Sequence, residues 1–142
     1  MSVQALRAIG SLVLIAHGLG HAMTALPIFG IKLSGTHSAE SWLLAKFLGP
    51  GPAKGLCVVL HLLVLLGFVG AGMALSDWGL PWRSWERWAL WASGLSLQGI
   101  GLFWNAFPFL VPNKVGVLTV DVFIFLSILV LRWPVGLFQG PG

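Results

Sequence analysis

Charged residues are scarce in this sequence of 142 residues. Asp, Glu, Lys and Arg together make up 8% of the chain, whereas soluble domains carry about 25%. Apolar residues make up 57%, and the mean hydropathy is +0.91. Because small domains leave much of their surface exposed, one small core does not hide so many apolar side chains. We therefore expect the surplus to face lipid, in an integral membrane protein.

Several catalytic and binding signatures are also missing. Cys57 is the only cysteine, which excludes an internal disulfide and a CxxC redox pair. The sequence contains no HExxH, no GxSxG and no glycine-rich phosphate loop, so it offers no known motif for those hydrolytic or nucleotide-binding chemistries. The net charge of +4 comes from dispersed residues without a basic, aromatic-rich cluster. This pattern does not indicate nucleic-acid binding.

Four apolar segments are long enough to cross a bilayer as helices, at 3–26, 53–75, 85–107 and 113–133. Pro27, Pro108 and Pro134 follow three of them, where a helix is expected to stop. The first segment lacks an A-x-A cleavage site, so we expect a retained helix and not a signal peptide. The sequence predicts an all-α membrane protein whose single domain, residues 1–136, is a four-helix transmembrane bundle. The tail 137–142 resembles the remnant of a protease-cleavage tag.

A short interfacial helix is predicted between the first two spans. The stretch from Ser38 to Leu48 is amphipathic, with Ser38 as its N-cap and Gly49–Pro50 as its end. Glycines in the spans predict close helix contacts; they include Gly18, Gly67, Gly99 and Gly101. Tryptophans near the span ends predict interfacial anchors; they include Trp42, Trp78, Trp85 and Trp104. The Lys and Arg residues divide four against four between the two faces, so the charge count leaves orientation open.

Polar side chains recur at one depth in the predicted bundle. His17 and His21, in the stretch AHGLGHAM, are one helical turn apart and share a helix face. Counted from the helix ends at one face, these two residues, His61 and Asp121 all lie roughly 7 to 14 Å below it. Because polar groups facing hydrocarbon are costly, we expect all four side chains to turn into the bundle. They are the candidate cofactor-binding and metal-binding residues.

The chemistry of this four-residue group stays open at the level of the sequence. A structural role is one reading, with His61 hydrogen-bonded to Asp121. Three imidazoles and a carboxylate would also suit zinc, copper or iron. A b-type haem held by His61 and by His17 or His21 is a third reading. A proton relay or hydrogen bonding to a quinone is a fourth.

The first helix resembles that of DoxX-like proteins, a group of small four-helix bacterial membrane proteins. The resemblance rests on Arg7, Gly10 and the pair His17–Gly18 in LRAIGSLVLIAHGLGH, and it extends loosely to the closing NKVGVLTVDVFIFLSILVLRWP. It implies location in a bacterial inner membrane and a role near quinones or thiol redox stress. His21 departs from the family pattern, which often has lysine there.

Three functional hypotheses follow from these observations. The leading one is a small redox-associated membrane protein that binds a transition metal, haem b or a quinone at the four-residue group. The alternatives are a non-catalytic accessory subunit or lipid-binding scaffold of a membrane complex, and an oligomeric proton or small-solute transporter. Expected partners are the lipid bilayer, a hydrophobic small molecule, and further copies or subunits of a membrane complex, but no nucleic acid. Whether the protein is an enzyme stays open.

Overall fold

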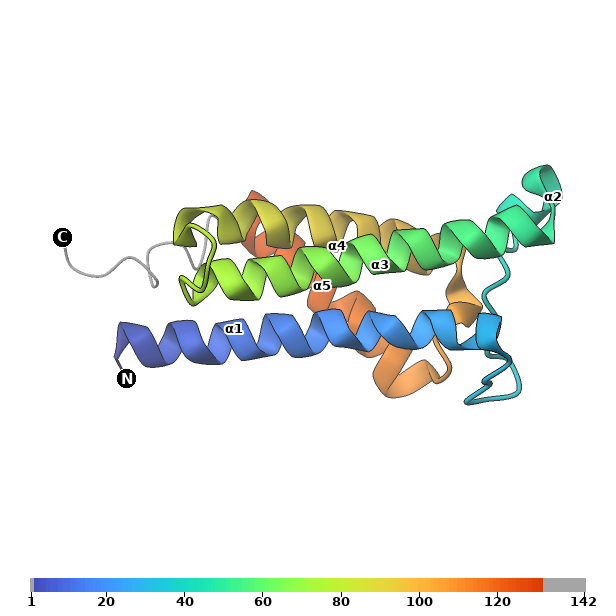
Figure 1. Ribbon diagram of the computed structural model, residues 1–142, viewed down its shortest axis with the longest axis horizontal. Helices are drawn as coiled ribbons and strands as arrows, with labels where there is room; N and C mark the ends of the chain where they lie inside the picture. Colours follow the sequence, from blue (N-terminus) through green and yellow to red (C-terminus); the bar gives the residue numbers. More distant parts are fainter. Residues whose placement is uncertain (1, 132–142) are drawn as a thin grey trace.

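The computed structural model describes residues 2–131, which are helical throughout apart from the connections (Figure 1). It contains five α-helices: α1 (Val3–Gly20), α2 (Leu44–Leu48), α3 (Pro50–Leu75), α4 (Trp85–Leu102) and α5 (Val115–Leu129). Two longer irregular helices extend them: the 3-10 helix η1 (His21–Phe29) continues α1, and the π-helical η4 (Leu110–Lys114) leads into α5. Short 3-10 turns lie at Trp82–Ser84 (η2) and Trp104–Ala106 (η3). No strand occurs within residues 2–131, which confirms the all-α prediction.

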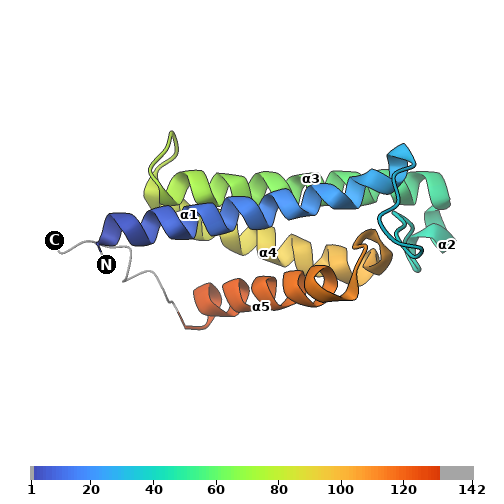
Figure 2. The same cartoon turned by 90° about the horizontal axis from the view of Figure 1, so that it is seen from below.

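The long helix α3 is central to the bundle. It packs along α1 on one side and along α4 on the other, and α4 in turn packs on α5. Figures 1 and 2 show these four helices running alongside one another, with α2 at one end. The core between α1, α3 and α4 contains Val64, Phe68, Ala71, Ala89 and Ala92. The alanines among these residues let the helices approach closely and so position the polar residues between them.

Glycines set the closest helix contacts, as the sequence predicted for two of them. A methyl group at Gly18 would lie 2.8 Å from Phe68 Cβ, and one at Gly67 would lie 2.8 Å from Ala92 Cβ. Only a residue without a Cβ fits at such distances. The predicted contact at Gly101 is wrong within the described residues, because a methyl group there would meet nothing within 4 Å.

Three helical segments have the length and apolar composition to cross a membrane: Val3–Phe29, Pro50–Leu75 and Leu110–Leu129. Their outer faces expose large apolar side chains such as Leu12, Leu63 and Phe123, so they suit contact with a lipid bilayer. The prediction of helices long and apolar enough to span a membrane is confirmed for these three. The 18-residue α4 is shorter and is not among them.

Two predicted helix ends are wrong. The first span does not stop before Pro27, because the chain tightens into η1 and continues to Phe29, where Gly30 ends it at φ 79°. The φ of proline, near −65°, lies within the range of a 3-10 helix. The third span ends at Leu102 and not at residue 107, because Phe103 leaves the helical region at φ −126° and ψ 49°. The predicted stop at Pro134 and the tail 137–142 lie outside the described residues.

The short helix before α3 also begins later than predicted. Ser38 does not cap it, because its hydroxyl accepts from the Glu40 N–H and its own N–H donates to the Asn105 carbonyl at 2.8 Å. The N-cap position of α2 is Leu43, and Ser41, two residues before it, accepts from the Leu44 N–H at 3.0 Å. The predicted end at Gly49 is confirmed.

The tryptophans differ in their exposure. Trp42, Trp78 and Trp104 are exposed, which suits the predicted anchoring role. Trp85 is buried in the core against α3, so the prediction that it anchors at the interface is wrong.

Candidate functional site

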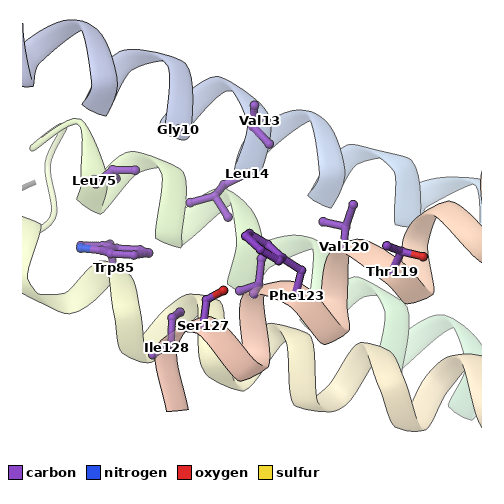
Figure 3. Close-up of a pocket in the computed structure, with 11 residues that line it drawn as sticks. Gly10, Val13, Leu14, Leu75, Trp85, Thr119, Val120, Phe123, Ser127 and Ile128 are labelled. Carbon is purple, nitrogen blue, oxygen red and sulfur yellow. The ribbon is translucent and has the colours of Figure 1, made fainter. Parts of the chain in front are cut away.

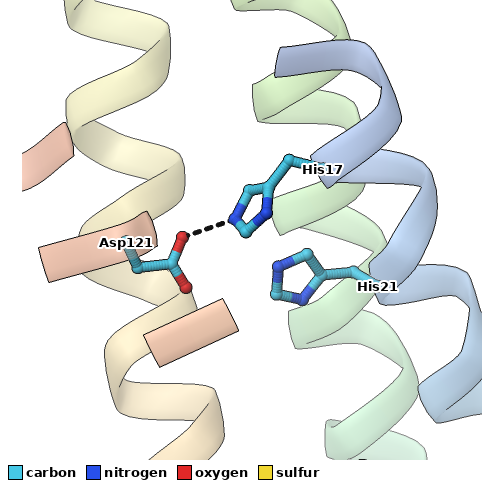
Figure 4. A group of neighbouring side chains, drawn as sticks. All are labelled: His17, His21 and Asp121. Carbon is cyan, nitrogen blue, oxygen red and sulfur yellow. Dashed lines mark hydrogen bonds and ion pairs between the residues drawn. The ribbon is translucent and has the colours of Figure 1, made fainter. Parts of the chain in front are cut away.

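A histidine–aspartate pair joins α1 to α5. His17 Nε2 lies 2.8 Å from Asp121 Oδ1, and the imidazole N–H donates to the carboxylate (Figure 4). The Asp121 side chain is fully buried and that of His17 is 9% exposed. Both therefore turn into the bundle, as the sequence predicted. Because a buried carboxylate needs compensation, this bond holds the two helices at a fixed depth and rotation.

Ser96 on α4 completes the contacts of the carboxylate. Its hydroxyl donates to Asp121 Oδ2, and its Oγ also lies 3.4 Å from His21 Nε2. A continuous polar chain therefore runs from His17 through Asp121 and Ser96 to His21, across α1, α5, α4 and η1. The sequence analysis missed Ser96, although an internal serine in an apolar helix was a usable signal.

His21 lies at the change from α1 to η1 and is fully buried. Its ring meets that of His17 edge to face, with centroids 5.4 Å apart. The rings of Phe68 and Phe107 pack around it, with centroid distances of 6.0 and 5.7 Å. These aromatic rings shield the imidazole, and among the described residues Ser96 is the partner of its ring nitrogen.

His61 stands behind His21 and does not reach Asp121. The two imidazoles stack with centroids 5.8 Å apart, and His61 Nδ1 donates to the Cys57 carbonyl at 2.8 Å. The predicted His61–Asp121 hydrogen bond is therefore wrong, since His17 and Ser96 occupy the carboxylate oxygens. Glycine at position 99 makes room for the His61 ring, because a methyl group there would lie 3.1 Å from Nε2.

The hydrogen bonds fix which imidazole nitrogens carry lone pairs. In neutral His61, Nδ1 donates to a carbonyl, so Nε2 carries the lone pair. Ser96 gives its single hydrogen to Asp121, so its contact with His21 requires Nε2 to donate and leaves the lone pair on Nδ1. Within residues 2–131 neither His21 Nδ1 nor His61 Nε2 has a hydrogen-bond partner. Two buried acceptors thus lack a donor or a cation.

His17, His21 and Asp121 each offer one ligand atom within 4.8 Å of the others. His21 and His61 also line a small pocket of about 120 Å³ between η1 and α3. The structure thus brings three predicted residues into one group and places His61 beside it, in contact with His21. Two imidazoles and a carboxylate are a set that binds transition metals.

A second, apolar cleft lies between α1 and α5. Its volume is about 380 Å³, and Val13, Leu14, Val120 and Phe123 are among its lining residues (Figure 3). It begins one helical turn from His17. Its lining residues include no histidine or carboxylate, so it supplies no ligand for a metal.

His37, which the sequence analysis left aside, has a structural role. It is buried, its Nδ1 accepts from the Leu33 N–H at 3.1 Å, and its Nε2 donates to the Ala106 carbonyl at 3.0 Å. These bonds tie the long connection before α2 to η3. Because both ring nitrogens are used, His37 is complete without a ligand.

These features define a small all-helical protein with three long apolar helices, suited to a membrane, and a buried histidine–aspartate group. No protein family model, curated protein or solved structure matches the chain. The resemblance to DoxX-like proteins therefore stays a prediction that rests on residues of the first helix.

Proposed function

We propose that this protein holds a transition-metal ion inside the membrane, with His17, His21 and Asp121 as ligands. One observation carries the proposal: three ligand atoms from separate elements lie within 4.8 Å of one another in the buried interior. In a tetrahedral site with bonds of about 2.0–2.1 Å, ligand atoms lie about 3.4 Å apart. Side-chain rotations of modest size would close that difference.

The surroundings of the group also favour a cation. Asp121 supplies a negative charge that offsets part of the cost of placing a cation among hydrocarbon. Ser96 donates to the carboxylate oxygen that His17 does not use, as outer-shell partners of metal ligands commonly do. His61, whose Nε2 lone pair has no hydrogen-bond donor within residues 2–131, is stacked on His21 beside the three proposed ligands. We propose His61 as the fourth ligand, aligned by its bond to the Cys57 carbonyl.

The dimensions of the pocket beside His21 and His61 favour a metal ion there over a haem or a quinone. Pockets for drug-sized ligands and cofactors measure about 300–1,000 Å³, whereas the pocket beside His21 and His61 measures about 120 Å³. The two rings are stacked 5.8 Å apart at their centroids, which leaves no slot for a haem plane between them. A redox role follows if the ion is iron or copper, because zinc does not change oxidation state.

The proposal includes α4 as a fourth span. Its 18 residues measure about 27 Å along the axis, close to the 30 Å of the hydrocarbon core. The Ser96–Asp121 bond fixes α4 at the depth of the middle of α5. The helix therefore lies within the same layer as the three apolar segments.

Metal content of the purified protein tests the proposal. We expect about one iron, copper or zinc ion per chain after reconstitution in detergent, measured by mass spectrometry, and loss of that ion in Asp121→Asn. His61→Gln removes the proposed fourth ligand and should weaken binding without abolishing it, because three protein ligands remain. His37→Ala is the matched control, because it removes a buried imidazole away from the group. Fewer than about 0.1 ions per chain with every metal offered would refute the proposal.

A non-catalytic scaffold is the second candidate. The observation in its favour is that His17, Asp121 and Ser96 already satisfy one another, which joins α1, α4 and α5 without any ligand. In that case metal would be absent and the same substitutions would act on stability alone.

A further inference from the structure

The outer face of α4 differs from the lipid-facing surfaces around it. Trp91, Gly94, Gln98 and Gly101 follow one another along this side of the helix at spacings of three and four residues, and we call them the Gln98 face. Trp91 is 73% exposed, and Gln98 and Gly101 are exposed as well. Most exposed side chains of α3 and α5 are instead large and aliphatic or aromatic, although the polar Thr119 of α5 is exposed as well.

The depth of Gln98 follows from its neighbour Ser96. Ser96 is hydrogen-bonded to Asp121, halfway along the apolar segment Leu110–Leu129. Gln98 lies two residues further, about 3 Å along the axis. The opposite side of α4 is buried, so the amide points away from the bundle at mid-membrane depth.

An amide at this depth needs hydrogen-bond partners. Gln98 Nε2 donates to the Gly94 carbonyl of its own helix at 3.1 Å, and this is the only hydrogen bond of the side chain within residues 2–131. The carbonyl oxygen and the second N–H are therefore left for another molecule. Lipid chains offer neither donors nor acceptors, so a protein partner is favoured.

We propose that the Gln98 face binds a second copy of this chain, in a parallel dimer whose two-fold axis is normal to the membrane. In such a dimer each residue meets its own equivalent at the same depth. A glutamine amide is both donor and acceptor, so two copies of Gln98 satisfy each other reciprocally. This self-complementarity is the reason for choosing a second copy over an unrelated helix.

The shape of the face supports close approach. A methyl group at Gly101 would meet nothing within 4 Å, and one at Gly94 would meet only Phe125 at 3.6 Å. The Trp42 indole donates to the Gly101 carbonyl at 2.9 Å, but space remains in the Cβ directions of Gly94 and Gly101, so a partner helix can come near the backbone on both sides of Gln98. A hollow of about 290 Å³, lined in part by Trp91 and Phe125, lies beside the amide and receives the exposed indole of the other copy.

Disulfide cross-linking in membranes tests the proposal directly, because the single native cysteine, Cys57, is fully buried. We expect Gly101→Cys and Trp91→Cys to form covalent dimers on mild oxidation. Leu63→Cys, on the exposed side of α3, is the control and should stay monomeric. Equal cross-linking at position 63, or none at 91 and 101, would overturn the proposal, as would a disulfide to a different protein.

Gln98→Leu separates the amide pairing from simple contact between helices. Because Gln98→Leu removes the interhelical hydrogen bonds, we expect the dissociation constant of the dimer to rise three- to thirty-fold. The constant is measured by dilution in detergent. Gln98→Asn, which keeps an amide, should restore part of the affinity. A leucine variant that dimerises as well as the native chain would overturn the pairing. The dimer rests on α4 crossing the membrane but not on the metal, so metal content in the Gln98 variants reports on the proposed function separately.

Discussion

The His17–Asp121 pair gives the sharpest test of how the buried polar group stabilises the bundle. The perturbation is a double-mutant cycle with His17→Leu and Asp121→Val, measured on chelator-treated, metal-free protein. The leucine variant leaves a fully buried carboxylate with Ser96 as its remaining partner. Breaking a buried ion pair from one side costs about 3–5 kcal/mol, whereas replacing both partners with apolar residues is often neutral.

The magnitudes then follow from what each variant leaves behind. We expect His17→Leu to lower the free energy of unfolding by about 3 kcal/mol. Asp121→Val leaves a neutral imidazole without its acceptor and should cost about 1–3 kcal/mol. The double variant removes both members of the pair but leaves the buried Ser96 hydroxyl without its carboxylate acceptor. It should therefore lie within about 2 kcal/mol of the native protein, so the coupling free energy is at least about 2 kcal/mol. A neutral interhelical hydrogen bond would give only about 0.6 kcal/mol.

The assay is reversible unfolding in mixed detergent and dodecyl sulfate micelles, followed by helicity. The exposed Lys54–Glu40 ion pair, 3.0 Å long, is the matched control, and its coupling should stay below about 1 kcal/mol. If the double variant costs the sum of the two single variants, the pair contributes no coupling. The argument that an uncompensated buried charge dominates would then be refuted.

Two further predictions concern other parts of the bundle. Gly18→Ala places a methyl group 2.8 Å from Phe68 Cβ and should lower the free energy of unfolding by about 1–3 kcal/mol. Gly20→Ala, with open space around it, should be neutral or raise that free energy by up to about 1 kcal/mol. Thermal unfolding in detergent compares the two variants, and equal effects would contradict the tight α1–α3 contact. His37→Ala removes the hydrogen bond to the Ala106 carbonyl. It should speed amide hydrogen exchange in residues 31–43 while leaving the bundle helices protected. Unchanged exchange in residues 31–43 would argue against the tethering role of His37.

The helices were predictable because the features that specify each one lie within a single continuous stretch of the sequence. A long apolar run, a breaker after it and a rise of about 1.5 Å per residue are properties of the chain itself. They place His17, His21 and Asp121 at one depth, and the structure has these three residues together. Depth along a helix axis is thus readable from residue counts once the helix ends are known to within a turn.

Tertiary structure decided which polar groups meet at that depth. Helix rotation and lateral position depend on contacts such as that of Gly18 with Phe68, which no residue count contains. Those contacts bring His17 and Ser96 within hydrogen-bonding distance of the Asp121 carboxylate. They leave His61 stacked on His21, with no hydrogen-bond partner for His61 Nε2 within residues 2–131. The sequence by itself determined that the protein suits a membrane and that its polar residues share a level. The packing of four helices determined their partners, because hydrogen bonds require both distance and direction.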